Sequence, residues 1–214
     1  MKPLLILRPE PGNRATAARA RALGLEARQS PLFEMVSTAW TAPDASGFDH
    51  LLLTSANAVR HGGAGLARLR DLSVLAVGPA TAAAARKAGF RVARTGEAGV
   101  AALLEALPAG LRLLHLSGQD HHDTGDRPYV RTIAVYRARP LDCELPAGAF
   151  VALVHSARAG ARLAQLAPDR SRIAVAAISA AAAAACGSGW AAIEWVACPD
   201  DAALLALAAR LCQE

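Results

Sequence analysis

The stretch Ser-Val-Leu-Ala-Val-Gly-Pro-Ala-Thr-Ala-Ala-Ala-Ala-Arg-Lys-Ala-Gly-Phe, residues 73–90, decides the fold because the chain repeats its pattern further along. The segment Arg172–Trp190 has the same order of an apolar strand, a turn, an alanine-rich helix and a glycine followed by an aromatic residue. Aligning the two copies places Gly89 on Gly189. A repeat of this length is too long for a solenoid unit and suits a small domain. The sequence therefore predicts two related lobes with a cleft between them.

The segments before each copy also repeat, since Leu51–Arg60 resembles Val151–Gly160 and pairs Ser55 with Ser156. Throughout the chain, short apolar runs alternate with helical segments that end in glycine. Strands separated by helices of this length are typical of parallel sheets with helices on both faces. We expect an α/β fold of two similar small lobes, each a parallel sheet flanked by helices.

The middle of the chain reads as an insertion. Thr132–Arg139 is an extended segment and a plausible partner for Ser30–Thr38, and pairing them would build the first lobe from both ends of the chain. A linker of two strands would then join the lobes. The boundaries that we expect are residues 1–34 plus 138–214 for lobe 1, 39–131 for the inserted lobe 2, and 30–38 and 131–139 for the linker strands.

Composition narrows the classes of partner. The 214 residues carry a net charge of +5, which favours an anionic partner, but the arginines are scattered and only 4% of residues are aromatic. Stacking platforms for single-stranded nucleic acid are therefore scarce, and a small polyanion fits better than a duplex. The 53% of hydrophobic residues come mostly from alanine and leucine, so we read the run Ala180–Ala185 as a buried helix rather than a membrane segment.

Targeting and metal signals are weak. The apolar run Leu4–Leu7 is too short for a secretory signal, which favours the cytoplasm. The four cysteines form no Cys-x-x-Cys pair, so we expect free thiols and no metal site. His121 and His122 suggest a metal ligand pair, but adjacent side chains diverge and a solvated loop is the favoured interpretation. The chain also lacks the P-loop, dinucleotide-binding and Gly-x-Ser-x-Gly motifs.

Polar residues follow the predicted strands. Gly78 and Thr81 lie where a strand turns into a helix, and could bind an anion or merely form an ordinary turn. Ser55 and Asn57 follow another strand, where one of them would serve as a helix cap. Arg8 ends the first strand, at the edge where open α/β sheets bind ligands.

Five motifs together resemble uroporphyrinogen-III synthases. They are Leu-Arg-Pro-Glu-Pro-Gly from Leu7, Leu-Thr-Ser-Ala-Asn-Ala-Val from Leu53, Ala-Val-Gly-Pro-Ala-Thr-Ala from Ala76, Val-Tyr-Arg from Val135, and His-Ser-Ala from His155. The resemblance spans nearly the whole chain, and its strength lies in the order of the motifs. It implies two α/β lobes on a two-stranded linker, with the linear tetrapyrrole hydroxymethylbilane as substrate. Such enzymes close the tetrapyrrole into uroporphyrinogen III in haem biosynthesis, with inversion of ring D, loss of water, and no metal or organic cofactor.

The resemblance also assigns residues. Tyr136 matches the linker tyrosine that helps the substrate hydroxyl to leave, although a packing role is equally open. The eight carboxylates of the substrate need many donors. The residues expected to bind them are Arg8, Ser55, Asn57, Gly78, Thr81, Gly118, Ser156, Arg158 and Ser179. The resemblance also implies a monomer, which could receive its substrate from the preceding pathway enzyme in a transient complex. We expect neither nucleic acid nor a membrane as a partner.

The chain departs from the family pattern in the second repeat. Where the family has Ile-Gly-Pro-Thr-Thr-Ala, this chain has Ile178–Ala183, in which only Ser179 keeps a hydroxyl. The family's glycine- and arginine-bearing turn appears here as residues 117–123, in which Gly118 survives. These changes support an alternative function, a non-catalytic module of the same fold that binds an anionic tetrapyrrole or another small polyanion.

Overall fold

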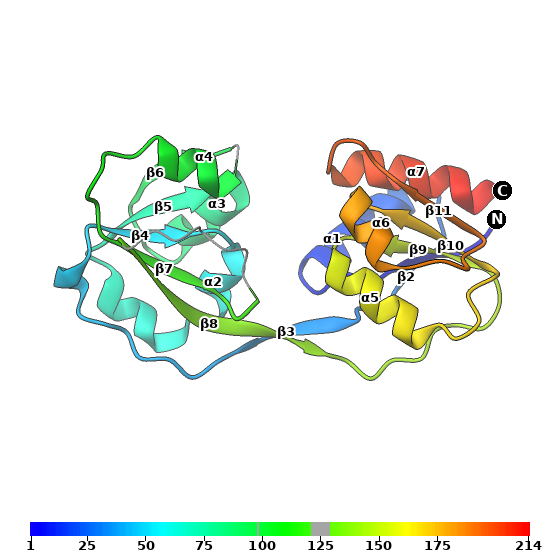
Figure 1. The fold of residues 1–214 in the computed structure, drawn as a ribbon, viewed down its shortest axis with the longest axis horizontal. Helices are drawn as coiled ribbons and strands as arrows, with labels where there is room; N and C mark the ends of the chain where they lie inside the picture. Colours follow the sequence, from blue (N-terminus) through cyan, green and yellow to red (C-terminus); the bar gives the residue numbers. More distant parts are fainter. Residues whose placement is uncertain (98, 121–128) are drawn as a thin grey trace. The chain divides into compact units, whose positions relative to one another are not determined.

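The computed structural model describes residues 1–97, 99–120 and 129–214, and the chain divides into two units (Figure 1). Unit 1 contains Met1–Glu34 and Arg139–Glu214, and unit 2 contains Met35–Ala138. Each unit has its own parallel sheet with helices on both faces, which confirms the predicted fold class. His121 and His122 lie outside the described residues.

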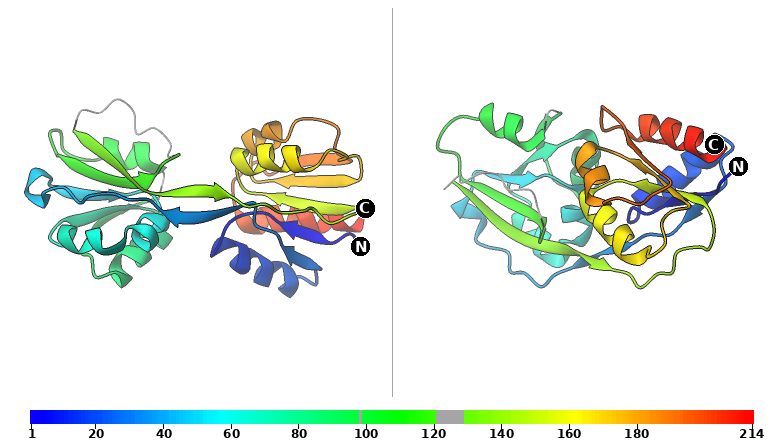
Figure 2. Two further views of the ribbon diagram at one scale, coloured as in Figure 1. Left: turned by 90° about the horizontal axis from the view of Figure 1, so that it is seen from below. Right: turned by 45° about the vertical axis from the view of Figure 1, so that its right-hand side comes forward.

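Unit 1 is built on a five-stranded sheet of order β11-β10-β9-β1-β2, in which every neighbouring pair is parallel. Its strands are β1 (Leu4–Ile6), β2 (Ala27–Gln29), β9 (Phe150–Val154), β10 (Ile173–Ala177) and β11 (Ala192–Trp195). Its helices are α1 (Gly12–Ala22), α5 (Ala157–Leu166), α6 (Ala180–Ala185) and α7 (Asp201–Gln213). Helices α1 and α7 cover one face of the sheet, and α5 and α6 cover the other (Figure 2).

The central strands of unit 1 are buried on both faces. All five residues of β9 are buried, and so are all five of β10. Val151 and Leu153 pack into the cluster formed with α1 and α7, and the alternate residues of β9 point to the opposite face. Burial on both faces explains why these strands read as continuous apolar runs rather than as alternating patterns.

Unit 2 is built on a six-stranded sheet of order β3-β8-β7-β4-β5-β6, and the pairs from β8 to β6 are parallel. Its strands are β3 (Phe33–Ser37), β4 (His50–Leu53), β5 (Ser73–Val77), β6 (Val92–Gly96), β7 (Leu113–Gly118) and β8 (Val130–Pro140). Its helices are α2 (Ala56–His61), α3 (Pro79–Lys87) and α4 (Gly99–Glu105), with the short helices η1 (Ala45–Gly47) and η2 (Gly63–Leu69). Helices α2 and α3 pack on one face and α4 on the other.

Strands β3 and β8 are neighbours in the unit 2 sheet, and the boundary between the units falls inside both of them. The amide of Thr38, just after β3, donates to the carbonyl of Val135 at 3.0 Å. The hydroxyl of Thr38 donates to the carbonyl of Ala134 at the same distance. These two bonds fasten the end of β3 to the middle of β8 within unit 2.

The sequence repeat appears as the pair β5–α3 and its counterpart β10–α6. Gly89, with φ of 85°, follows the C-cap of α3 and ends this helix as the alignment predicts. In the second copy α6 ends earlier, at Ala185, and Gly187, with φ of 70°, follows its C-cap in place of Gly189. The prediction that the run Ala180–Ala185 is a buried helix was too simple. Only Ala182 and Ala183 of α6 are buried, because α6 lies on the outside of a sheet and its other side meets solvent. Among the described helices, none is long and apolar enough to cross a membrane.

Candidate active site

The predicted catalytic Tyr136 lies on β8 with its ring directly over Gly118, the last residue of β7. A methyl group on Gly118 would be 2.8 Å from Cε2, 2.9 Å from Cζ and 3.1 Å from the hydroxyl oxygen of Tyr136. The amide of Gln119 donates to the Tyr136 carbonyl at 2.8 Å. The structure thus brings two sequence-predicted residues into contact at the carboxyl edge of the unit 2 sheet.

His61, at the end of α2, is the other ring beside Tyr136. The centroids of the two rings are 6.0 Å apart, and the rings are tilted by 36°. Burial lowers the pKa of His61 below its usual value, and the charge of Arg60 lowers it further. Tyr136 therefore lies beside an imidazole that is neutral at neutral pH.

Ser55 is the N-cap of α2. Its hydroxyl oxygen accepts a hydrogen bond from the amide of Asn57 at 3.2 Å. The side-chain oxygen of Asn57 accepts from Nη1 of Arg60 at 3.0 Å. Only one of the two residues is therefore a cap. The Ser55 hydroxyl proton and the Asn57 amide nitrogen keep donor capacity for a ligand.

In the turn before α3, the groups exposed to a ligand belong to the backbone rather than to side chains. Gly78 is the N-cap of α3 with φ of 80°, its amide donates to the carbonyl of Gly96 at 2.7 Å, and Pro79 opens the helix. No side chain among the described residues caps α3, so the first-turn amides keep their donor capacity. Thr81 is 5% exposed. The hydroxyl of Thr81, which the sequence analysis expects to bind a ligand, therefore has little contact with solvent in this structure.

A series of hydrogen-bonded side chains, Thr54, His115 and Thr132, crosses the unit 2 sheet beside this edge, and the sequence did not reveal it. His115 of β7 is 1% exposed. Its Nε2 lies 3.0 Å from the hydroxyl of Thr54 and its Nδ1 lies 3.3 Å from the hydroxyl of Thr132. A buried imidazole thereby fixes the position of Thr54, the residue between β4 and the Ser55 cap. The pairing of β4, β7 and β8 creates this series, and no local motif announces it.

In unit 1, two further predicted residues are N-caps. The hydroxyl oxygen of Ser156 accepts from the amide of Ala159 at the start of α5, and that of Ser179 accepts from the amide of Ala182 at the start of α6, both at 3.2 Å. Each serine hydroxyl keeps its proton for donation. Arg158, in the first turn of α5, is exposed, and its guanidinium carbon lies 6.0 Å from the centroid of the Phe33 ring.

Arg8 follows β1 and is bound to a carboxylate that sequence reasoning missed. Its Nη1 donates to Oδ1 of Asp201 at 3.1 Å and to the hydroxyl of Thr16 at 3.3 Å. The Thr16 hydroxyl lies 3.2 Å from each oxygen of Asp201. Asn13 of α1 supports the loop, because its Nδ2 donates to the carbonyls of Ile6 and Arg8 at 2.9 and 2.8 Å.

Asp201 is the first residue of α7, and it also contacts His155 and Arg19. Nε2 of His155 donates to Oδ1 of Asp201 at 2.9 Å, and Nη2 of Arg19 donates to Oδ2 at 2.6 Å. Burial alone would raise the pKa of Asp201, but the hydrogen bond from His155, the positive charge that His155 carries once it is protonated at low pH, and the charge of Arg19 hold the pKa of Asp201 well below its usual value. Burial lowers the pKa of His155 despite the bond to Asp201. The carboxylate is therefore ionised and the imidazole neutral at neutral pH.

The register of the strands brings this cluster together. Ile6 of β1 is paired with Leu153 of β9, so Arg8 and His155 both lie two residues beyond the same pair. Arg8 and Asp201 are 193 residues apart in the chain. The one sequence signal for Asp201 is a pair of aspartates at the start of the last helix, where acidic residues suit the helix dipole.

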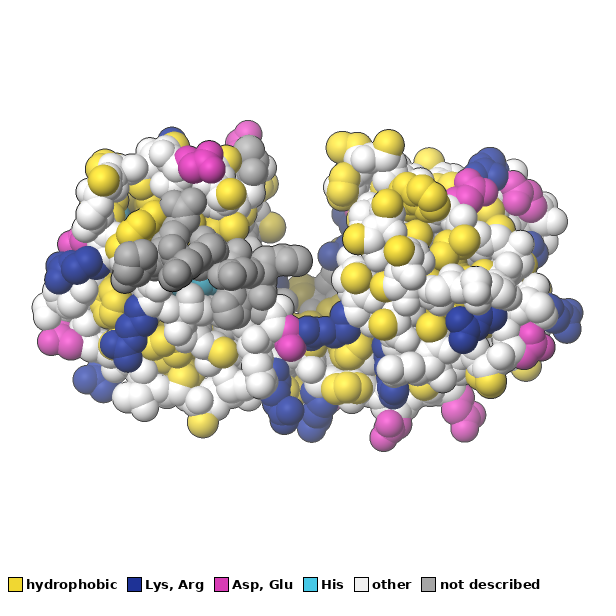
Figure 3. Space-filling model, viewed as in Figure 1, with side chains coloured by type: hydrophobic (Ala, Val, Ile, Leu, Met, Phe, Trp, Pro, Cys, Tyr) yellow, Lys and Arg dark blue, Asp and Glu magenta, His cyan; other side chains and the backbone are white. Residues whose placement is uncertain are grey.

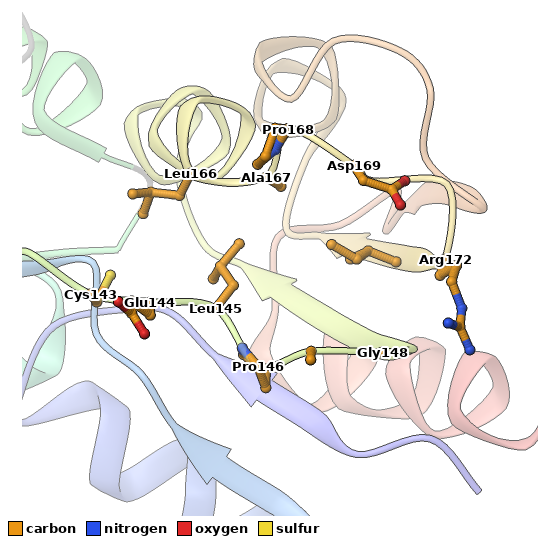
Figure 4. Close-up of a pocket in the computed structure, with 12 residues that line it drawn as sticks. Cys143, Glu144, Leu145, Pro146, Gly148, Leu166, Ala167, Pro168, Asp169 and Arg172 are labelled. Atoms are coloured by element: carbon orange, nitrogen blue, oxygen red, sulfur yellow. The ribbon is translucent and has the colours of Figure 1, made fainter.

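Two grooves lie at the opposite edges of the sheets. One of about 620 Å³ in unit 1 is lined by Cys143–Gly148 before β9 and by residues between α5 and β10, including Asp169 and Arg172 (Figure 4). The other, of about 640 Å³ in unit 2, is lined by residues before β4 and β5. Neither groove includes a predicted site residue, because parallel strands place all of those residues at the carboxyl edges.

The basic side chains are dispersed. On the face drawn in Figure 3, Lys and Arg occur on both units among Asp and Glu, as the scattered arginines of the sequence predict. The structure thus places hydrogen-bond donors at the carboxyl edge of each sheet. They come from the side chains of Arg8, Ser156, Arg158 and Ser179 in unit 1, and in unit 2 from Ser55, Asn57, Tyr136 and the first amides of α3, which follow Gly78. Gly118 contributes space for the Tyr136 ring. Within each unit, donors of this kind can bind carboxylate groups of a small molecule.

Solved structures with a similar fold are known. The structure is similar to that of uroporphyrinogen-III synthetase from Helicobacter pylori, with a TM-score of 0.72, 18% identity, and coverage of 99% of this chain and 100% of that chain. It is also similar to a mutant uroporphyrinogen III synthase from Thermus thermophilus, with a TM-score of 0.53, 19% identity and coverage of 99% and 100%. At these identities the likeness shows the fold alone. A search of curated proteins found no match.

The comparison with family models shows the family of the chain, whereas the structural comparison shows only its fold. The family model for uroporphyrinogen-III synthase HemD matches residues 14–206, which include both copies of the repeat and most of the residues discussed above. Because the match extends over most of the sequence, the chain belongs to the uroporphyrinogen-III synthase family, as its motifs predicted.

Proposed function

We propose that this protein converts hydroxymethylbilane into uroporphyrinogen III, with inversion of ring D and loss of water, in haem biosynthesis. Membership of the family supports a cyclising lyase. The observation in the structure that carries the proposal is the contact between Tyr136 and Gly118, which fixes a phenol at the carboxyl edge of a parallel sheet, beside helix starts that offer donors.

The substrate's carboxylates are bound by the two donor-bearing edges. In unit 2, the Ser55 hydroxyl and the Asn57 amide are the side-chain groups that we assign. Gly78 and Gly118 contribute by their lack of a side chain, because Gly78 lets a carboxylate approach the first amides of α3 and Gly118 leaves space for the Tyr136 ring. In unit 1, they are the side chains of Arg8, Ser156, Arg158 and Ser179. Thr81 contributes through its backbone amide, since its side chain is buried. Binding many carboxylates restricts a flexible linear tetrapyrrole, and bringing its two ends together supplies much of the rate acceleration.

Tyr136 acts on the leaving group. In the reaction, the carbon–oxygen bond of the terminal hydroxymethyl group breaks and water leaves. For ring D to be inverted, the methylene carbon bonds to the substituted α-carbon of ring D, the bond from that α-carbon to the neighbouring bridge breaks, and the bridge carbon re-forms its bond at the free α-carbon. Tyr136 donates a hydrogen bond or proton to the departing oxygen, and the proton lost from the free α-carbon balances the one consumed. Gly118 makes this possible because a larger residue would push the ring aside.

The first test is direct. Purified protein is mixed with freshly made hydroxymethylbilane, the products are oxidised, and the uroporphyrin isomers are separated by chromatography against a control without enzyme. We expect predominantly isomer III, formed faster than the spontaneous product. Isomer I alone, at the spontaneous rate and with folded protein, would refute the enzymatic proposal and favour a non-catalytic module that binds an anionic tetrapyrrole.

We also propose the lobe boundaries expected from the sequence, with residues 1–34 and 138–214 as lobe 1, 39–131 as lobe 2, and 30–38 and 131–139 as linker strands. The position of the unit boundary inside β3 and β8 supports this assignment. A fragment of residues 35–138 should then unfold cooperatively on its own. Failure of the fragment to form the far-ultraviolet circular dichroism of a folded α/β domain would contradict the assignment.

We further propose that the protein is a cytoplasmic monomer that needs no metal or organic cofactor, and that it receives its substrate from the preceding pathway enzyme in a transient complex. The reactivity of the linear tetrapyrrole, which cyclises without enzyme, favours such a handover. Sedimentation of the purified protein should give a mass near 22.1 kDa. A stable dimer at micromolar concentration would contradict the monomer.

A further inference from the structure

Arg8 is held by one of its three nitrogens. Two hydrogen bonds hold its guanidinium, and both come from Nη1, to Asp201 and to Thr16. Within the part of the chain that the structure describes, Nε and Nη2 of Arg8 have no hydrogen-bond partner. An arginine side chain carries five N–H donors, and the edge formed by Nε and Nη2 matches the two oxygens of a carboxylate. The internal bonds therefore leave a complete carboxylate-binding edge unused.

Gly12 provides the space in which this guanidinium lies. A methyl group on Gly12 would be 2.5 Å from Nε, 2.7 Å from Cζ and 2.8 Å from Nη2 of Arg8. Gly12 is the first residue of α1 and its φ is not positive, so the backbone itself does not require glycine there. The close approach of Arg8 is thus the reason that the structure gives for this glycine. The obstructed atoms belong to the end of a flexible side chain, so a substitution would displace Arg8 rather than the helix.

The charges around Asp201 leave room for a second anion. Its carboxylate contacts two guanidinium groups, those of Arg8 and Arg19, and a neutral His155. One negative charge therefore faces two positive charges. The Arg8 side chain is 33% exposed, whereas that of Asp201 is 20% exposed, so solvent reaches the arginine more than the aspartate. An incoming carboxylate would be attracted to the same arginine that Asp201 already holds.

We propose that Asp201 and Gly12 are positioning residues, which hold Arg8 with its Nε and Nη2 edge directed to a carboxylate of the substrate. Asp201 accepts a hydrogen bond from Nη1 and so fixes the orientation of the Arg8 guanidinium. Gly12 leaves the space that this guanidinium occupies. The inference rests on the proposed function for the identity of the substrate. The arrangement of Arg8, Gly12 and Asp201 is independent of that function.

The test compares Gly12→Ala, Asp201→Asn and Arg8→Ala, with Gly47→Ala as the matched control. A methyl group on Gly47 meets nothing within 4 Å, and Gly47 belongs to η1, which precedes β4 in unit 2. The probe is uroporphyrin III, a stable octacarboxylate, titrated by fluorescence, and hydroxymethylbilane is used for kcat and KM. We expect both Gly12→Ala and Arg8→Ala to raise Kd and KM roughly 10- to 100-fold, as loss of a charged hydrogen-bonding pair does, with a smaller change in kcat.

Two readouts separate positioning from a loss of structure. In the Arg8→Ala background, Gly12→Ala should have no further effect on Kd, because the two changes remove one interaction. Asp201→Glu should restore more binding than Asp201→Asn, since it keeps the charge that holds Nη1. The ¹⁵N signal of Arg8 Nε should report an ordered side chain in the wild type and an averaged one in Gly12→Ala, while the melting temperature of Gly12→Ala stays within about 2 °C.

The outcomes are distinguishable from those of the proposed function. Wild-type affinity for uroporphyrin III in Gly12→Ala and Asp201→Asn, with weakened binding in Arg8→Ala, would overturn the positioning role. Unchanged binding in Arg8→Ala, or no binding by the wild type, would overturn the carboxylate contact. Production of isomer I alone by a protein whose Kd responds as expected would refute the proposed function and leave the positioning of Arg8 supported.

Discussion

Replacing Gly118 with alanine tests whether the contact with Tyr136 is built into the protein. The added methyl would lie 2.8, 2.9 and 3.1 Å from three atoms of the ring, where ordinary contacts begin at 3.4 Å. The ring has little freedom to withdraw, because the Tyr136 carbonyl is bonded to the amide of Gln119 and the side chain packs against the core cluster of unit 2. Overpacking of this kind costs about 1–3 kcal/mol.

We therefore expect Gly118→Ala to lower the free energy of unfolding in urea by about 1–3 kcal/mol and to lower kcat, because the phenol is displaced from the reacting group. Gly47→Ala is the matched control, since its methyl enters open space, and it should change the free energy of unfolding by less than about 0.5 kcal/mol. Unfolding is followed by circular dichroism, and an unchanged m-value shows that the comparison is sound.

A double-mutant cycle isolates the cause. In a Tyr136→Ala background the ring is absent, so adding Gly118→Ala should cost less than about 0.5 kcal/mol. Wild-type stability and kcat in Gly118→Ala would refute the reasoning. So would a penalty that persists at full size after Tyr136 has been removed, because the clash would then involve some other group.

Four further changes test other parts of the structure. Tyr136→Phe keeps the ring over Gly118 but removes the hydroxyl, so kcat for isomer III should fall about 100-fold or more with little change in the free energy of unfolding. A decrease in kcat of less than about 3-fold would favour a packing role for Tyr136. Gly160→Ala places a methyl 2.7 Å from the Ala182 carbonyl and 2.9 Å from Sγ of Cys186. It should lower the free energy of unfolding of unit 1 in urea by about 1–3 kcal/mol, and an unchanged free energy would contradict the tight packing of α5 on α6. Because burial lowers the pKa of His155 in the folded protein, the unfolded chain takes up its proton first, and stability should fall as the pH drops below about 6.5. The carboxyl of Asp201, whose pKa is lowered, adds stability that is present above pH 3.8 and lost as the pH falls further. His155→Gln should reduce the first decline in urea midpoint, to which the lowered pKa of His61 also contributes, and should weaken the second, because His155 helps to hold the pKa of Asp201 low. Burial raises the pKa of Cys186 to about 11, so a thiol reagent at pH 8 should modify the exposed Cys198 at least 10-fold faster than Cys186. Mass spectrometry of the labelled protein measures the two rates, and equal rates would contradict the burial of Cys186.

The fold was predictable because its signals are local and repeated. The continuous apolar runs that become β9 and β10 reflect burial on both faces, and Gly89, with positive φ, ends α3 where the sequence predicts it. The prediction failed in detail for α6, where alanine gives no indication of which side is buried. Alanine is compatible with both a core and a solvent-facing position, so a run of it carries no amphipathic pattern.

The candidate site was only partly predictable for a different reason. Ser55 and Ser156 stand at local boundaries between strand and helix, where a single sequence is informative. Asp201 was missed because its partner Arg8 is 193 residues away, and His115 because it bonds Thr54 across 61 residues. Gly12 was missed because its role is to leave space for a side chain, and a sequence alone does not show which atoms approach a glycine.

The altered turn of the second repeat exchanges one kind of donor for another. In the first copy, Gly78 and Pro79 begin α3 without a side-chain cap, so backbone amides remain to bind an anion. In the second copy, Ser179 caps α6 by accepting from the amide of Ala182, and its own hydroxyl proton remains to be donated. Loss of the family's glycine, proline and threonines therefore does not remove hydrogen-bonding capacity from this edge. Because the donors are replaced rather than lost, the departure that most favoured a non-catalytic module is equally compatible with a working enzyme.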